Sequence, residues 1–230
     1  MKPLLSESED NNSLQALGRA SVQIVHDLKN QLNGLKLYAT FLRRRLEKGD
    51  RPADELETIN KLIVGIDRTA EGLSLLSEYG QPIALKKQGA TDLQQILRGV
   101  VANLNGNASG QTADAALIVV DAENSPLLSE VDAELLAEAL KSISIGAMKL
   151  FKSRKKEGAL KVQLSSDKTG SHRDGVIEWQ VLDSVDHDPF RSFAGTDEIR
   201  MALAAKVIEA HGGSAERLNS TLRVRLPLID

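Results

Sequence analysis

The sequence contains no cysteine, which excludes disulfide frameworks and thiolate metal sites. No apolar run approaches the roughly 18 residues that a membrane-spanning helix requires. The N-terminal stretch from Met1 to Asn12 is acidic and polar, without the basic flank and apolar core of a signal peptide. We therefore expect a cytoplasmic protein with no membrane span, in which residues 1–12 form a flexible tail.

Several functional classes lack their signatures. The formal net charge is −3, and no basic stretch carries interleaved aromatic residues, so we expect no nucleic-acid partner. No P-loop and no Gly-x-Ser-x-Gly elbow is present. The histidines do not have metal-ligand spacing, so we expect no metal site; they are His26, His172, His187 and His211. With 230 residues, the chain is long enough for two small domains.

Leucine and isoleucine recur at helical spacing in the first third of the chain. The spacing predicts a long amphipathic helix from about Ser13 to Lys48 and a second from Ala53 to Tyr79. Residues 49–52 read GDRP, a sequence that ends a helix. Two long helices joined by a short turn lie antiparallel. Each apolar stripe is too wide for one partner helix, so we expect two hairpins to pair as a homodimeric four-helix bundle.

Beyond Gly80–Pro82 the pattern changes to short alternating elements. We expect strands over 83–87, 116–121, 160–164, 176–182 and 221–226, and helices over 91–103, 132–151 and 198–210. A loop is expected over 105–112, and a turn containing Gly170 and Gly175 between the third and fourth strands. This order predicts an α/β sandwich with helices on one face of a sheet. The expected domains are residues 13–80 and 83–230.

His26 has a distinctive setting on the first helix. It lies about 200° around the helix from Ile24 and Leu28, on the outer face. Asp27 is adjacent, and Asn30 follows one turn later on the same patch. A lone exposed histidine is ordinarily a plain surface residue. This arrangement, however, suits phosphoryl transfer, because a carboxylate can hold the ring or take its proton and an amide can orient the incoming group.

Residues 26–35 read HDLKNQLNGL, which resembles the H box of sensor histidine kinases. The resemblance implies that His26 accepts a phosphoryl group, assisted by Asp27 and Asn30. It also implies that residues 13–80 are a dimerisation and phosphotransfer domain, and that residues 83–230 resemble the ATP-binding α/β sandwich of that family.

The resemblance of the second domain is incomplete. Residues 140–151 read LKSISIGAMKLF, which is similar to the N-box helix of the family. The two asparagine positions of that helix hold Ser142 and Gly146. Glycine has no side chain with which to ligate Mg²⁺.

Two further nucleotide-binding elements also depart from the family pattern. Asp183 stands where the family has an adenine contact, but no glycine follows it, so it is either a vestigial adenine contact or a plain loop aspartate. Residues 201–213, MALAAKVIEAHGG, match the family's downstream helix. The glycine positions just before it hold Glu198 and Arg200, and the segment that would form the ATP lid is short. With Asp197, Glu198 would repel a triphosphate.

The sequence thus predicts a histidine phosphotransferase of a two-component phosphorelay. His26 would exchange phosphate with the aspartate of a response-regulator receiver domain, which supplies Mg²⁺, and Leu32 or Tyr38 would contact that receiver. We expect no tightly bound cofactor and no ATP binding. Two alternatives stay open: a divergent soluble histidine kinase that autophosphorylates with ATP, and a non-catalytic pseudokinase scaffold. We expect Trp179 to be a core residue and His211 to be a structural residue at a helix C-terminus.

Overall fold

The computed structural model describes residues 25, 28–47, 53–87, 89–108, 118–123, 125–152, 158–169, 172–181, 188–193 and 195–229. The chain divides into two compact units, Met1–Pro82 and Ile83–Asp230. Each unit is described by itself.

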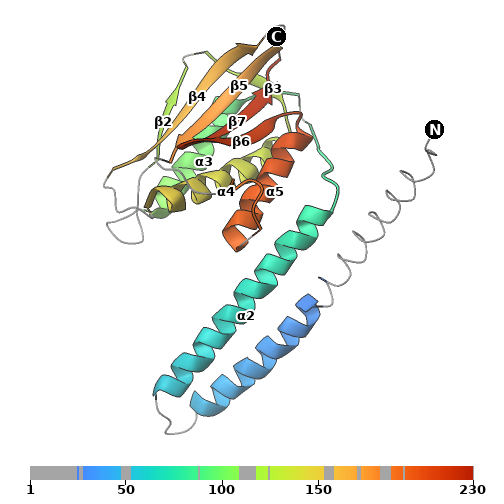
Figure 1. Cartoon of the computed structure of the whole chain (residues 1–230), viewed down its shortest axis with the longest axis vertical. Helices are drawn as coiled ribbons and strands as arrows, with labels where there is room; N and C mark the ends of the chain where they lie inside the picture. Colours follow the sequence, from blue (N-terminus) through green and yellow to red (C-terminus); the bar gives the residue numbers. More distant parts are fainter. Residues whose placement is uncertain are drawn as a thin grey trace, which may run out of the picture. The chain divides into compact units, whose positions relative to one another are not determined.

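The first unit is a helical hairpin (Figure 1). Residues 28–47 are helical, and α2 spans Ala53–Gly80, which confirms the predicted helix over 53–79. Ala39 on the first helix and Ile66 on α2 are buried. Lys36 Nζ lies 2.6 Å from Asp67 Oδ1, so an ion pair links the two helices.

The second unit is a sheet covered on one face by three helices (Figure 1). Its elements are β1 (Ala90–Asp92), α3 (Leu93–Ala108), β2 (Ile118–Ala122), β3 (Leu128–Glu130), α4 (Ala133–Lys152), β4 (Leu160–Thr169), β5 (His172–Gln180), α5 (Thr196–Ala210), β6 (Ser214–Leu218) and β7 (Thr221–Pro227). The five-stranded sheet has the order β2-β4-β5-β7-β6, and β1 pairs with β3 separately. Only the β2–β4 pairing of the large sheet is parallel. The predicted α/β architecture with helices on one face is confirmed.

The core lies between the sheet and the helices. Trp179 on β5 is fully buried, as predicted, and its indole Nε1–H donates to Ser144 Oγ on α4 at 3.0 Å. Leu140 and Ile143 of α4 are also fully buried. Because a buried indole N–H requires a partner, Ser144 fixes the position of α4 over the sheet.

The predicted strand over 83–87 is wrong. This segment has no regular structure, and the first strand is β1. The backbone N–H of Lys86 donates to the Asp132 carboxylate at 2.9 Å instead of joining a ladder.

The predicted loop over 105–112 begins too early, because α3 continues to Ala108. Asn105 is held within this helix by the start of β2. Its side-chain amide donates to the Ile118 carbonyl and accepts from the Ile118 N–H, both at 3.0 Å. A polar residue that looks like a loop residue thus ties a helix to a strand.

The assignment of Gly175 to a turn is also wrong. Gly175 lies inside β5, paired with Ser166 and Leu226, and it is buried. β4 ends at Thr169 and β5 begins at His172. Gly170, the other residue of the predicted turn, lies outside the described residues.

The C-terminus of α5 has the expected glycine ending. His211 is the C-cap and is buried, which confirms its predicted structural role. Gly212 has φ +82°, the left-handed conformation that glycine adopts without strain. The Gly213 N–H donates to the Ile208 carbonyl at 3.0 Å and completes the helix end.

Candidate functional site

Of the three candidate phosphotransfer residues, the structure describes only Asn30. His26 and Asp27 fall outside the described residues, as does Asp183. Asn30 is helical and exposed. The grouping of His26, Asp27 and Asn30 on one patch therefore stays a prediction from the sequence.

Two exposed apolar residues follow Asn30 on the same helix face. Leu37 and Phe41 are 54% and 56% exposed, and they lie seven and eleven residues after Asn30. At 100° per residue, both lie within about 20° of Asn30 and about 200° from the buried Ala39. This face therefore points away from α2.

A separate apolar face runs along one flank of the hairpin. On the first helix, Leu35 and Leu42 are 54% and 53% exposed and lie one heptad apart. On α2, Leu62 is 53% exposed. Lys36 is rotated 100° from Leu35, so its ion pair with Asp67 marks the opposite flank. One flank of the hairpin is thus charged and paired, while the other is apolar and uncovered.

Among the sequence-predicted receiver contacts, Tyr38 is 68% exposed and Leu32 is half-buried. Tyr38 is therefore accessible, whereas Leu32 shares the helix face of the buried Ala39. Leu37 and Phe41, the two exposed apolar residues on the face of Asn30, were not singled out from the sequence. The spacing of seven and eleven residues from Asn30 is the sequence signal that identifies them.

The two helices that carry the nucleotide-box resemblance pack directly against each other. Gly146 on α4 is buried, and Met201 on α5 is 3% exposed. A β-carbon at position 146 would lie 2.9 Å from Met201 Cγ and closer still to Sδ. The position that resembles a Mg²⁺-binding asparagine is therefore covered by a methionine side chain.

The acidic residues at the start of α5 have partners on neighbouring segments. Lys149 Nζ on α4 donates to both carboxylate oxygens of Asp197 at 2.6 Å. Ser192 Oγ donates to the Glu198 carboxylate. Both partners of the Lys149–Asp197 ion pair are exposed, so it contributes little stability. It does pair Lys149 of the N-box-like helix with an acidic residue of the first turn of α5.

Phe190 precedes α5 and is 4% exposed as part of the same core. The Phe190 N–H donates to Asp188 Oδ1 at 3.0 Å, which fixes this turn. Phe190 and Met201 are thus two large apolar side chains that are buried in the core of the second unit.

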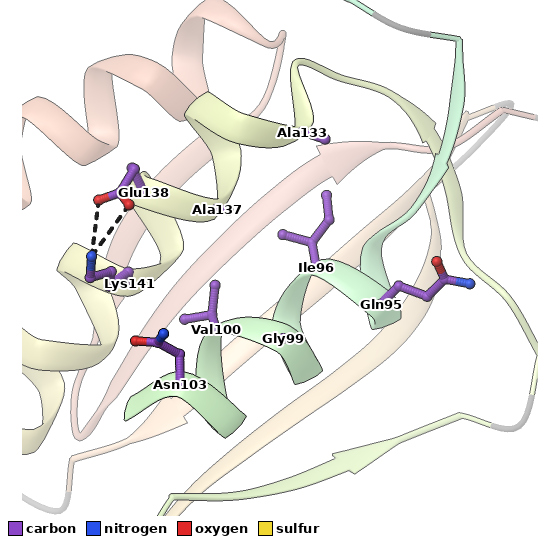
Figure 2. Close-up of a pocket in the computed structure, with 9 residues that line it drawn as sticks. All are labelled: Gln95, Ile96, Gly99, Val100, Asn103, Ala133, Ala137, Glu138 and Lys141. Carbon is purple, nitrogen blue, oxygen red and sulfur yellow. Dashed lines mark hydrogen bonds and ion pairs between the residues drawn. The ribbon is translucent and has the colours of Figure 1, made fainter. Parts of the chain in front are cut away.

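A groove of about 330 Å³ lies between α3 and α4 (Figure 2). Its apolar lining includes Ile96, Val100 and Ala137, and Glu138 and Lys141 pair along one rim. No residue of α5 lines it. It is therefore distinct from the α4–α5 contact.

Among the described residues, no group of three histidine, aspartate or glutamate side chains could hold a metal ion. None of the helices described is both long and apolar enough to cross a bilayer.

No protein-family model matches this sequence, and the comparison with curated proteins found no match. Solved structures do match. Full-length ShkA in complex with AMPPNP gives a TM-score of 0.60 at 18% identity, covering 91% of this chain but only 46% of that chain. The histidine kinase ThkA in complex with the response regulator TrrA gives 0.58 at 17% identity, covering 100% and 68%. The Acinetobacter baumannii histidine kinase AdeS gives 0.55 at 15% identity, covering 87% and 97%. The chain therefore has a histidine kinase-like fold.

Proposed function

We propose that this chain is a histidine phosphotransferase of a two-component phosphorelay that works in the cytoplasm without ATP. The observation that carries the proposal is the packing of Gly146 against Met201, because it fills the position from which an N-box asparagine would reach Mg²⁺. The H-box sequence around His26, on a histidine kinase-like fold, supports phosphoryl transfer at the hairpin.

The transfer is a displacement at phosphorus. The neutral imidazole of His26 attacks the phosphorus of an aspartyl phosphate on the receiver domain. A P–N bond forms as the P–O bond to the aspartate breaks, and the electron pair stays on the receiver's carboxylate. Asp27 holds the imidazolium proton, and Asn30 orients the phosphoryl oxygens. The receiver supplies Mg²⁺, which neutralises the developing charge. In the reverse direction the same groups return the phosphoryl group to a receiver aspartate.

The partner is a receiver domain, and its proposed docking surface includes Leu37 and Phe41. These side chains share a helix face with Asn30. Arg44 and Arg45 follow within one turn and are exposed. An apolar patch flanked by arginines suits a protein whose phosphorylated site is acidic. ThkA was solved in complex with a response regulator, which is consistent with a partner of this class.

The proposed dimer uses the other apolar face. Leu35, Leu42 and Leu62 line one flank of the hairpin and are each more than half exposed. Pairing this flank with that of a second copy would bury all three in a four-helix bundle, while the Lys36–Asp67 flank stays in water. Leu37 and Phe41 would remain outside the bundle.

The alternative is an ATP-competent histidine kinase. Its support is the fold itself and the likeness to ShkA, which was solved with AMPPNP. Against it, position 146 offers no side-chain ligand for Mg²⁺, and Met201 fills the space beside it. A pseudokinase scaffold is the third possibility, and it would need no phosphoryl transfer at His26.

Transfer from a receiver tests the proposal. Receiver domains encoded in the same genome are phosphorylated with radiolabelled acetyl phosphate, freed of the donor, and mixed with wild type or His26→Ala. We expect at least one receiver to transfer label to the wild-type protein. That label should be lost in acid, as is typical of phosphohistidine. Equal labelling of His26→Ala would contradict the assignment of His26. No transfer from any receiver would favour the scaffold.

A further inference from the structure

Asp132 uses its two carboxylate oxygens for two separate segments. Oδ1 accepts from the Leu135 N–H at 3.1 Å and so caps the N-terminus of α4. Oδ2 accepts from the Lys86 N–H at 2.9 Å. Asp132 is buried. A single carboxylate thus joins the first turn of α4 to the segment that leaves the hairpin.

The backbone of Asp132 is itself held from α5. The Asp132 N–H donates to His211 Nε2 at 3.0 Å, and His211 Nδ1 lies 2.8 Å from the Val207 carbonyl oxygen. Because Nε2 accepts a hydrogen bond, these contacts assign the imidazole proton to Nδ1, which donates to Val207. His211 is 2% exposed. The C-cap residue of α5 therefore holds the backbone of Asp132 in place.

The segment held by Asp132 has few other restraints. Ile83 packs against the core of the second unit, but residues 83–87 form no strand. Among the described residues, the backbone N–H groups of Ala84 and Lys87 donate to no partner. The Lys86–Asp132 hydrogen bond is therefore the main polar restraint on this segment.

We propose that Asp132 is a latch that holds residues 83–87 on the second unit and so confines the joint between the two units to Gly80–Pro82. Without the latch, only the apolar contact of Ile83 would anchor this segment, so it would open more often. Each opening would add residues 83–87 to the joint and lengthen its reach by up to about 17 Å. Asp132 is thus a positioning residue that sets how many residues the joint between the two units contains. This inference does not depend on the proposed phosphotransfer.

Asp132→Ser removes the hydrogen bond to Lys86 while keeping the hydrogen bond that caps α4. Serine still caps α4 by accepting from the Leu135 N–H, but its single short hydroxyl does not also hold Lys86. Lys86 and Lys87 are exposed and precede trypsin-sensitive bonds. Local opening that exposes these bonds controls their cleavage. We expect Asp132→Ser to raise the rate of cleavage after Lys86 and Lys87 about tenfold or more.

Mass spectrometry of the fragments identifies the cleaved bonds, and the fluorescence of Trp179 reports whether the second unit is folded. Glu134→Ala is the matched control, because Glu134 is exposed in the same turn of α4 and should leave cleavage unchanged. A folded Asp132→Ser variant that is cleaved no faster than wild type would overturn the latch.

Hydrogen exchange in wild type tests the latch without a variant. The Lys86 amide should exchange at least tenfold more slowly than those of Ala84 and Lys87, after correction for intrinsic rates. Equal exchange of the three amides would overturn the proposal even if Asp132→Ser failed to fold.

Discussion

Gly146 of α4 and Met201 of α5 approach so closely that a β-carbon at position 146 would lie 2.9 Å from Met201 Cγ. Both residues are buried. Where the resemblance to histidine kinases places a metal-binding asparagine, this chain packs one helix against another. In this chain, Met201 fills the space that a side chain at position 146 would need.

A double-mutant cycle measures this packing. In an ordinary helix interior, replacing glycine by alanine stabilises by about 0.5–1 kcal/mol. Overpacking costs about 1–3 kcal/mol, so Gly146→Ala should destabilise the wild-type protein by about 1 kcal/mol. In a Met201→Ala background the same change should stabilise. Urea unfolding followed by Trp179 fluorescence measures both, and a Gly146→Ala effect of the same sign in both backgrounds would contradict the close packing.

The dimer is tested on its apolar flank. Leu42→Glu should place a charge in the proposed four-helix bundle and convert the dimer to monomer, as measured by light scattering on a sizing column. Phe41→Glu is the matched control, since Phe41 is equally exposed but lies on a different face. A wild-type monomer, or two variants with the same assembly state, would refute the assignment of this flank.

Docking of the receiver is tested on the helix face that carries Leu37 and Phe41. Phe41→Glu should slow phosphoryl transfer from a receiver at least tenfold, because it replaces an apolar contact with a negative charge facing an acidic partner. Phe41→Leu keeps the apolar surface and should retain most of the rate. The idea fails if Phe41→Glu transfers at the wild-type rate with the dimer intact.

The pH dependence of stability follows from Asp132. The N–H groups of Lys86 and then Leu135 hold the pKa of its carboxyl below the usual range, while burial opposes this effect. The folded-state pKa therefore lies below the unfolded value of about 3.9. The resulting stabilisation is present above that value and is lost as the pH falls through the folded-state pKa.

Asp132→Asn removes this titration. Between about pH 4 and pH 2, the free energy of unfolding should fall less steeply for Asp132→Asn than for wild type. Urea unfolding at several pH values measures both slopes. Parallel curves over this range would show that the carboxylate is not held by these donors.

Periodicity alone predicted the elements that bury one regular face. The helix beginning at Ala53 and the paired strands β4 and β5 were identified from the spacing of their apolar residues. The short edge strand β6 was missed, because its sequence SAERL carries little apolar alternation and its pairing with β7 provides the missing information.

The wrong predictions arise where a side chain from elsewhere in the chain decides the backbone. Residues 83–87 alternate like a strand, but Asp132, more than forty residues later, accepts the Lys86 N–H. Asn105 looks like a loop residue, but Ile118 keeps it in α3. The spacing of residues within one segment does not predict hydrogen-bond partners that lie far away in the sequence.

For the candidate sites too, residue types could be read from the sequence but packing between distant segments could not. The sequence predicted that Gly146 stands where a resembling histidine kinase would have a Mg²⁺-binding asparagine, because that requires only a comparison of residue types. That Met201 covers this position depends on how α4 and α5 pack, which no local pattern encodes. His26, Asp27 and Asp183 lie outside the described residues, so their assignment stays a prediction.

In the proposed function, phosphate reaches His26 from a receiver domain and not from ATP. The most direct measurement incubates the purified protein in parallel with radiolabelled ATP and Mg²⁺ and with a radiolabelled phosphoreceiver, and maps the label by comparison with His26→Ala. We expect His26-dependent label from the receiver and none from ATP. Label on His26 from ATP alone would show that the chain is an autokinase and would contradict the proposed phosphotransferase.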